Sequence, residues 1–140
     1  MIVAVEKISD QTVLNKAFGI RKEVFVIEQK VDESEEYEFE EDSVHFIAKV
    51  DGDFAGTSRW RKTEKGIKLE RFAVLKKHRS KGVGSALLSY MLKDIPSEYK
   101  YLYLHAQITA MGLYAKFGFV AEGEQFEEAG IQHYKMVLKR

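Results

Sequence analysis

The sequence predicts one α+β domain in which a mixed, mostly antiparallel central sheet is flanked by helices. The 140 residues are close to the usual size of a single domain, and 45% hydrophobic with 31% charged residues is a globular composition. Apolar residues alternate along some segments and recur at helical spacing along others, which predicts strands and helices. With no internal repeat and no linker, residues 1–140 form one unit of element order β-α-β-β-β-α-β-α-β-β.

The N-terminal segment predicts a strand followed by a helix. Residues 2–8 are mostly strand formers, and Ser9 and Asp10 then supply side chains that cap a helix. Apolar residues follow at helical spacing, namely Val13, Ala17, Ile20 and Val24. Between Asp32 and Asp42, eight of eleven residues are acidic and none is basic, so we expect a solvated loop or an irregular helix there.

The middle of the chain predicts an antiparallel meander of three strands. Residues 45–50 alternate in polarity, the hairpin signal Asp51-Gly52 follows, and residues 54–61 form the second strand. A second turn around Lys65-Gly66 leads into the third strand, over residues 67–75. Because hairpins join antiparallel neighbours, we expect these three strands to lie side by side in the sheet.

The C-terminal half predicts two helices, each followed by sheet structure. An amphipathic helix runs from Val83 to Met91, with Gly82 and Gly84 at its start and Pro96 beyond its end. The remaining elements are a strand over residues 101–107, a short helix over residues 109–117 that stops at Gly118, and a last strand over residues 131–138.

Composition excludes several classes of function. Lysine plus arginine total 22, as do aspartate plus glutamate, so no overall charge draws the chain to nucleic acid or to an anionic membrane. The absence of cysteine excludes disulfides, thiolate metal sites and a cysteine-bound acyl intermediate. Residues 101–115, the longest uncharged stretch, are too few to cross a bilayer, and the N-terminus shows no export signal. We therefore expect a cytoplasmic protein.

The most informative segment is the turn from the third meander strand into the next helix. Its sequence is Arg79-Ser80-Lys81-Gly82-Val83-Gly84-Ser85, and Lys76 and Lys77 precede it. Glycines let backbone N–H groups and the positive helix end approach an anion, while basic side chains add charge against phosphates. The segment lacks the Lys-Ser/Thr ending of a nucleoside-triphosphate loop, and Leu87 stands where a dinucleotide motif has its third glycine. It predicts a phosphate cradle of another kind; the alternative is an ordinary turn with solvated lysines.

Two motifs in this order resemble those of the GNAT superfamily of N-acetyltransferases. The stretch from Arg79 to Gly84 is similar to its Arg/Gln-x-x-Gly-x-Gly/Ala signature. The later residues Gln107, Ala110, Leu113-Tyr114 and Phe117-Gly118-Phe119 are similar to its Asn…Ala…Leu-Tyr…Gly-Phe pattern. The resemblance covers about residues 44–138. The stretches Val24-Phe25-Val26-x-Glu28-Gln29 and Gly130-Ile131-x-His133 resemble a small bacterial single-domain branch of largely unassigned substrate.

The resemblance implies acetyl-CoA as cosubstrate. The backbone of Phe72, Ala73 and Val74 would pair with the pantetheine arm, and the N–H groups from Arg79 onward would hold the pyrophosphate. Gln107 stands where the family has asparagine, and it keeps an amide that would face the cofactor. An N–H near Val74, on a strand that is bulged in this family, would meet the oxyanion. The reaction needs no metal, and the histidines and carboxylates lack the spacing of metal ligands.

Tyr114 is the candidate general acid. By the resemblance it matches the tyrosine that protonates the departing sulfur, and a phenol is a reasonable proton donor to a nascent thiolate. The alternative is an aromatic side chain packed beneath the sheet edge.

Three residues are candidates for the base, because a primary amine must lose a proton before it attacks a thioester. Glu70 lies where several family members carry a glutamate base, and strand alternation places it on one face with Phe72 and Val74. A solvated carboxylate paired with a neighbour such as Arg71 is the alternative. His105 and His133 are the other candidates, since neutral imidazole is available near pH 7, and a structural hydrogen-bonding role is the alternative for each.

The acceptor side of the site is the least defined. Arg21, Glu28 and Gln29 follow a helical apolar stripe in the region that covers the substrate side in GNAT folds, so they are candidate acceptor contacts; a solvated helix face is the alternative. The acidic run 32–42 can steer a cationic amine or simply confer solubility. We expect a small-molecule or peptide amine as partner, no nucleic acid or membrane, and a monomer or homodimer.

The function predicted from these residues is N-acetyl transfer from acetyl-CoA to an amine by direct attack in a ternary complex. The first alternative is a non-catalytic module that binds CoA as a sensor. The second is an acyl-carrier-dependent acyltransferase of the homoserine-lactone-synthase type, which Val24-Phe25-Val26 and Glu28-Gln29 resemble. A nucleic-acid binder that uses residues 76–81 is a third alternative, which the neutral total charge disfavours.

Overall fold

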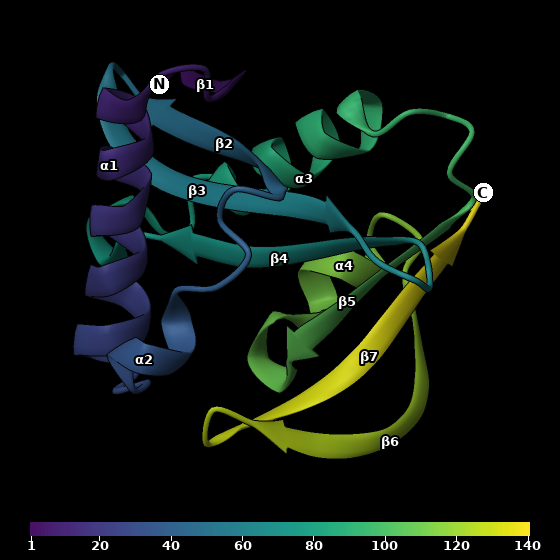
Figure 1. Cartoon of the computed structure of the whole chain (residues 1–140). Coiled ribbons are helices and arrows are strands. Elements are labelled where there is room, and N and C mark those ends of the chain that lie inside the picture. Colours follow the sequence, from purple (N-terminus) through teal and green to yellow (C-terminus); the bar gives the residue numbers. More distant parts are fainter.

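The computed structural model describes residues 1–140 and contains a seven-stranded sheet in the order β1-β2-β3-β4-β5-β7-β6 (Figure 1). The strands are β1 (Val3–Lys7), β2 (Ser43–Val50), β3 (Asp53–Lys62), β4 (Ile67–Val74), β5 (Tyr101–Gln107), β6 (Val120–Glu128) and β7 (Ile131–Lys139). Every neighbouring pair is antiparallel except β4 and β5, which are parallel. The predicted class, a mixed and mostly antiparallel sheet, is confirmed.

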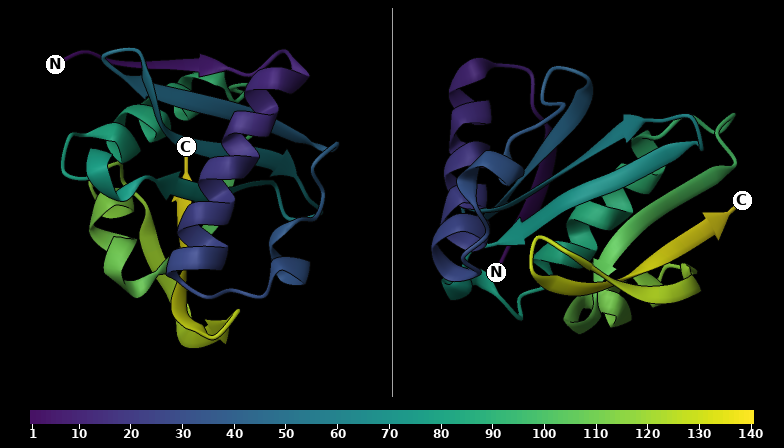
Figure 2. Two further views of the ribbon diagram at one scale, coloured as in Figure 1. Left: turned by 90° about the vertical axis from the view of Figure 1, so that its left-hand side faces the viewer. Right: turned by 60° about the horizontal axis from the view of Figure 1, so that its bottom comes forward.

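Helices cover both faces of this sheet. They are α1 (Gln11–Arg21), which continues as the π-helical segment η1 (Lys22–Glu28), α2 (Glu33–Glu36), α3 (Val83–Asp94) and α4 (Met111–Ala115), with 3₁₀ turns η2 (Lys76–His78) and η3 (Ile108–Ala110). Figure 2 shows α1 on one face of the sheet and α3 and α4 on the other. None of these helices combines the length and the apolarity needed to span a membrane.

Local sequence signals explain where the first elements begin and turn. The Asp10 side chain caps α1 by accepting a hydrogen bond from the Val13 N–H at 2.9 Å, as predicted. Asp51 and Gly52 both have positive φ, the conformation of a tight turn between β2 and β3. The apolar faces of these elements then meet in two clusters, a large one beneath α3 and a smaller one beneath α1.

The sheet opens between its two parallel strands. Only Ile67 with Leu102 and Lys68 with Tyr103 are paired, and beyond them β4 and β5 diverge, as Figure 1 shows. The rest of β4 therefore lacks a strand partner on that side, and its backbone groups there can pair with a ligand.

A bulge in β4 overturns one expectation about this strand. Thr57 of β3 lies opposite Ala73 and Arg59 lies opposite Glu70, so one residue of β3 between these pairs faces two of β4. The extra residue is accommodated where Arg71 has a φ of 59°. Glu70 therefore shares a face with Ala73 and lies on the face opposite Phe72, so the prediction that Glu70, Phe72 and Val74 share a face is wrong.

The acidic segment is less solvated than its charge suggests. It forms the single turn α2, capped by Asp32, and an irregular stretch that leads into β2. The Glu36 side chain is only 2% exposed, and Glu40 is partly buried, because both accept hydrogen bonds from Arg21. The expectation of a solvated run is wrong for these two residues, since a buried arginine compensates their charge.

Candidate active site

The opening between β4 and β5 is a cavity of about 630 Å³. Its walls come from β4, β5, the start of β7, η1, the acidic segment and α4. A second cavity of about 210 Å³ surrounds the loop between β4 and α3. Val74, Gly84 and Leu113 line both cavities, so the two form one continuous path along the edge of β4 and past the start of α3.

The loop in the second cavity presents unpaired donors. No hydrogen bond within the protein has its donor in the backbone N–H groups of residues 80–85. The loop reaches this conformation because Ser80 and Gly82 adopt left-handed φ values of 63° and 78°. These N–H groups precede or begin α3, a helix of twelve residues, so the positive end of its dipole adds to them. The predicted cradle, Arg79 to Ser85, thus has the donors that a phosphate requires.

The Arg79 side chain fastens this loop to two other segments. Its terminal nitrogens donate to both carboxylate oxygens of Glu28 at 2.6 and 2.7 Å, and its Nε donates to the Val74 carbonyl at 3.0 Å. These hydrogen bonds raise the pKa of Arg79 and lower the pKa of Glu28. Two residues predicted for different ligands, Arg79 for the cofactor and Glu28 for the acceptor, therefore bind each other.

A hydrogen-bonded pair of glutamines lines the large cavity. Gln29, which ends η1, and Gln107, which ends β5, exchange hydrogen bonds between their amides at 3.2 and 3.0 Å. Both residues line the cavity. The cofactor candidate Gln107 and the acceptor candidate Gln29 therefore meet at the same wall.

Tyr114 lies on α4 against β4. Its ring contacts Phe72 edge-on with centroids 5.4 Å apart, and only 6% of the residue is exposed. The hydroxyl forms no hydrogen bond within the protein, and the residue lines the large cavity. Burial raises the pKa of Tyr114, so the phenol keeps its proton at neutral pH. The side chain packs as a core aromatic and also presents a protonated group to the cavity.

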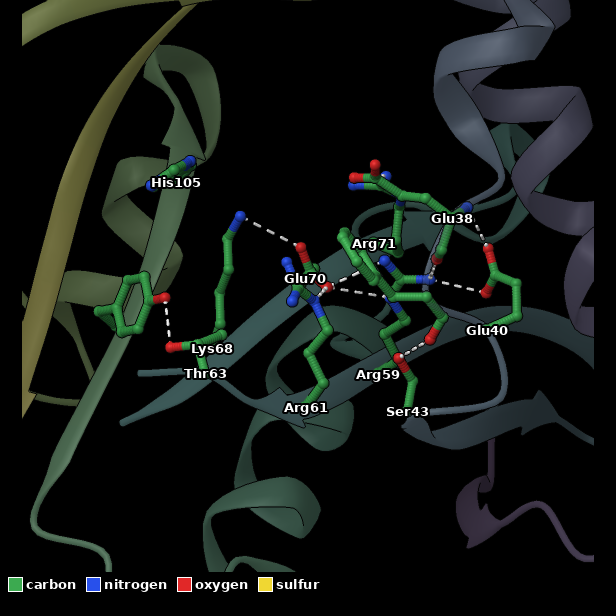
Figure 3. Close-up of polar contacts among 12 residues, drawn as sticks. Glu38, Glu40, Ser43, Arg59, Arg61, Thr63, Lys68, Glu70, Arg71 and His105 are labelled. Atoms are coloured by element: carbon green, nitrogen blue, oxygen red, sulfur yellow. Dashed lines mark hydrogen bonds and ion pairs between the residues drawn. The ribbon is translucent and has the colours of Figure 1, made fainter. Parts of the chain in front are cut away.

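Glu70 sits in a cluster of positive charges (Figure 3). Its Oε1 accepts hydrogen bonds from Arg59 at 2.9 Å and from Arg61 at 2.6 Å, and its Oε2 lies 3.2 Å from the Lys68 ammonium. Burial raises the pKa of Glu70, but these cations outweigh burial and bring the pKa to about 2. A carboxylate with so low a pKa is a weak base, so the structure disfavours Glu70 as the general base. Its partners are not Arg71, the neighbour considered from the sequence.

The two histidine candidates lie on the neighbouring strands β5 and β7. His105 Nδ1 lies 3.0 Å from Glu128 Oε2, and His133 Nδ1 lies 2.7 Å from the Ile131 carbonyl. Both partners are acceptors, so Nδ1 donates in each case and Nε2 of the neutral ring keeps its lone pair. The rings of His105 and His133 both contact Phe126.

Exposure distinguishes these two histidines. The His105 side chain is 26% exposed, whereas His133 is 6% exposed. The hydrogen bond from His105 also lowers the pKa of Glu128, which keeps that carboxylate ionised beside the ring. Glu128 is a site residue that the sequence analysis missed, because only the pairing of β6 with β7 brings it near β5.

Arg21 does not face the cavity. The residue is 1% exposed, and its guanidinium donates to Glu36 at 2.9 Å and to Glu40 at 2.8 Å. The structure therefore gives Arg21 the role of anchoring the acidic segment to α1, in place of the expected contact with an acceptor. No three His, Asp or Glu side chains are grouped so that they could hold a metal ion.

Comparison with known proteins assigns the family. Residues 4–140 match the model of the acetyltransferase (GNAT) domain. The chain is 40% identical over 128 residues to the uncharacterized N-acetyltransferase YjcF of Bacillus subtilis, which covers 89% of this chain and 91% of that protein. Its fold is similar to that of an acyl-CoA N-acyltransferase from Pseudomonas aeruginosa, with a TM-score of 0.78, 26% identity and 98% of each chain covered.

A second solved structure contains the cofactor. The fold is similar to that of a Bacillus subtilis acetyltransferase in complex with CoA, with a TM-score of 0.72, 18% identity and 99% of each chain covered. The diverging strands β4 and β5 and the N–H cradle lie within residues 4–140, the range that matches the family model. This chain belongs to the GNAT acetyltransferase family.

Proposed function

We propose that this protein transfers the acetyl group of acetyl-CoA to an amine by direct attack in a ternary complex. The observation that supports this most is the continuous path from the cradle of free N–H groups to the open edge of β4. Its two parts match the two parts of the cosubstrate. The cradle accepts phosphates, and the strand edge offers amide groups to a pantetheine arm.

The residues present fit acetyl-CoA. N–H groups of residues 80–85 would hold the pyrophosphate, and the backbone of residues 72–74 would pair with pantetheine. When bound, acetyl-CoA supplies the thioester whose acetyl group is transferred. The bulge at Arg71 turns backbone groups of β4 away from β3, and an N–H near Val74 is the proposed donor to the oxyanion.

Two side chains move protons in the proposed reaction. His105 accepts the amine proton at Nε2, because Glu128 holds the opposite ring nitrogen as the donor and the ring reaches the cavity. Tyr114 gives its hydroxyl proton to the departing sulfur, because burial keeps that proton in place until it is needed. The two groups belong to opposite faces of the sheet, which suits an acid and a base on opposite sides of the carbonyl.

The acceptor enters from the side of the acidic segment in this proposal. Glu35 and Glu38 line that wall of the cavity, together with Gln29. A primary amine arrives as a cation, so these carboxylates favour its approach. A CoA sensor and an acyl-carrier-dependent enzyme would have the same fold. Ligand binding and turnover therefore have to distinguish them from the proposed acetyl transfer.

The test is calorimetric titration with acetyl-CoA, with 3′-dephospho-CoA and ATP as comparison ligands, followed by CoA release in the presence of an amine library. We expect micromolar affinity for acetyl-CoA, a much weaker response to ATP, and turnover with at least one amine. Binding without turnover would support the sensor, and turnover only with acylated carrier protein would support the second alternative. Absence of acetyl-CoA binding would contradict the proposal.

A further inference from the structure

A buried histidine connects the β2–β3 hairpin to the cradle loop. His78 is 6% exposed and belongs to the 3₁₀ turn η2, directly before the cradle. Its Nε2 lies 2.7 Å from Asp53 Oδ2, and its Nδ1 lies 3.4 Å from the Lys81 ammonium. His78 also lines the small cavity around the cradle. Three side chains from two segments thus form one chain of hydrogen bonds, which passes through His78 at the cavity wall and ends at Lys81 in the cradle loop.

The partners fix the proton on this ring. Asp53 offers a carboxylate, which only accepts, so Nε2 of His78 carries the hydrogen and donates it. Lys81 offers an ammonium, which only donates, so Nδ1 accepts. The imidazole is therefore a neutral ring whose lone pair faces Lys81. A carboxylate on the far nitrogen increases the electron density of the near one, which strengthens the hold on the ammonium.

We infer that Asp53 and His78 are positioning residues that aim the Lys81 ammonium at the nucleotide phosphates of acetyl-CoA. A lysine side chain that is free in solvent loses rotamer freedom when it binds a phosphate, and this loss of entropy weakens binding. Because His78 orients the Lys81 side chain already in the free protein, this loss of rotamer freedom precedes phosphate binding and does not weaken it. This inference rests on the proposed function, because it assumes that a CoA phosphate occupies the small cavity.

The substitution Asp53→Asn distinguishes this inference from a simple effect of charge. Asp53 is a negative charge next to a site for anions, so its removal should tighten the binding of a phosphate if only charge matters. If Asp53 acts through His78 on Lys81, Asp53→Asn should weaken binding instead. Lys77 also lies 3.2 Å from Asp53, but its side chain is 67% exposed, so solvent screens that pair.

The experiment is a double-mutant cycle on the full chain, with the Kd for acetyl-CoA measured by calorimetry. We expect Lys81→Met and Asp53→Asn each to raise the Kd roughly threefold to tenfold. In the Lys81→Met background, Asp53→Asn should cause no further rise. Asp51→Asn is the matched control, since it makes the same change in the same hairpin and keeps an acceptor for the Ile2 N–H, and its Kd should equal that of the wild type. Thermal melting confirms that each variant is folded.

The outcomes separate the inference from the function on which it rests. A Kd that falls or stays constant on Asp53→Asn overturns the inference, as does an equal rise in both backgrounds, which indicates a structural role independent of Lys81. Either result leaves acetyl-CoA binding by the wild type intact. A wild type that binds no acetyl-CoA overturns both.

Discussion

The Tyr114 hydroxyl is the residue-scale feature on which the proposed chemistry depends most. It has no partner within the protein, and burial raises its pKa, so it is a protonated donor at the cavity wall. Tyr114→Phe keeps the ring and its edge-on contact with Phe72. We expect the rate of the chemical step to fall roughly a hundredfold, with an unchanged Kd for acetyl-CoA. Single-turnover kinetics and calorimetry measure the two quantities.

The control for this substitution is Tyr90→Phe. Tyr90 is an exposed tyrosine on α3 whose ring packs on Phe46, and it lines neither of the two cavities. It should retain the wild-type rate. An unchanged chemical rate for Tyr114→Phe would remove this hydroxyl from the mechanism.

The pairing of His105 with Glu128 makes a second residue-scale prediction. A base must be unprotonated, so kcat/KM should fall as the pH drops below the pKa of that base. His105→Ala should remove this acid-side inflection and lower the rate, and Glu128→Gln should also lower the rate because the ring loses the carboxylate that holds its hydrogen on Nδ1. The measurement is the pH profile of kcat/KM with a fixed amine acceptor.

His133→Ala and Glu70→Gln are the comparisons for that profile. His133 is nearly buried, and the pKa of Glu70 is about 2, so each variant should keep the acid-side inflection. Loss of the inflection in either one, with its retention in His105→Ala, would assign the base elsewhere. Retention in all variants would indicate a base made of water.

At the scale of elements, the loop between β4 and α3 has to expose its N–H groups, and Gly82 permits this. Gly82 has a φ of 78°, and no atom lies within 4 Å of the position that a Cβ would take. Gly82→Val is therefore resisted by backbone strain, roughly 1–3 kcal/mol, and its side chain would stand where a phosphate approaches. We expect a large rise in the Kd for acetyl-CoA, because the side chain obstructs the phosphate. The free energy of unfolding should fall only by the backbone strain.

Gly19→Ala is the matched control for that glycine. Gly19 lies in α1, also with open space around its Cβ position but without positive φ. Alanine should stabilise the helix by about 0.5–1 kcal/mol and leave acetyl-CoA binding unchanged. Equal acetyl-CoA affinity in wild type and Gly82→Val would mean that the cradle is misplaced.

Elements were easier to predict from the sequence than the relations between them. The capping side chain of Asp10, the turn at Asp51-Gly52 and the glycines at the start of α3 act locally, so their signals lie within a few residues. The bulge at Arg71 has no such signal, because a non-glycine residue adopts positive φ only when its neighbours impose it. That single residue reversed the predicted face of Glu70.

The same limit applies to the candidate site. Motif spacing found the cradle and Tyr114, because each is a short segment with its own chemistry. It missed Glu128 and the partners of Glu70, because hydrogen bonds between different strands create them and depend on the register of the sheet. It also assigned Arg21 to a ligand, since burial of an arginine depends on carboxylates that lie 15 and 19 residues away.

At the scale of the whole molecule, a network of buried ion pairs ties the helical layer to the sheet. Glu40 accepts from Arg21 of α1 at 2.8 Å and from Arg59 of β3 at 2.6 Å, and Arg59 continues to Glu70 of β4. Figure 3 shows the part of this network around Arg59. It underlies one wall of the cavity, so it fixes the position of the acidic segment relative to β4. Removal of one partner from ion pairs as buried as these strongly destabilises a protein, because the other charge stays buried without compensation.

This network makes stability depend on acid. Burial raises the pKa of Glu40 and of Glu70, but their arginine partners outweigh burial and bring each pKa to about 2. Both carboxylates are ionised in the folded protein at a pH where the unfolded chain binds protons. Their contribution is therefore complete above about pH 5 and is lost as the pH falls toward 2, roughly 2 kcal/mol each by pH 3. Burial raises the pKa of Glu36, which offsets part of this loss.

The prediction is that Glu70→Gln lowers the free energy of unfolding at pH 7 by roughly 3 kcal/mol and flattens its dependence on pH. The variant lacks one of the groups that bind protons on unfolding, so its deficit relative to the wild type should shrink between pH 5 and pH 3. Urea unfolding at several pH values measures this. Glu6→Gln, at an exposed glutamate 3.8 Å from Lys49, should give a curve parallel to the wild type. A parallel curve for Glu70→Gln as well would mean that Glu70 is not held ionised by Arg59 and Arg61.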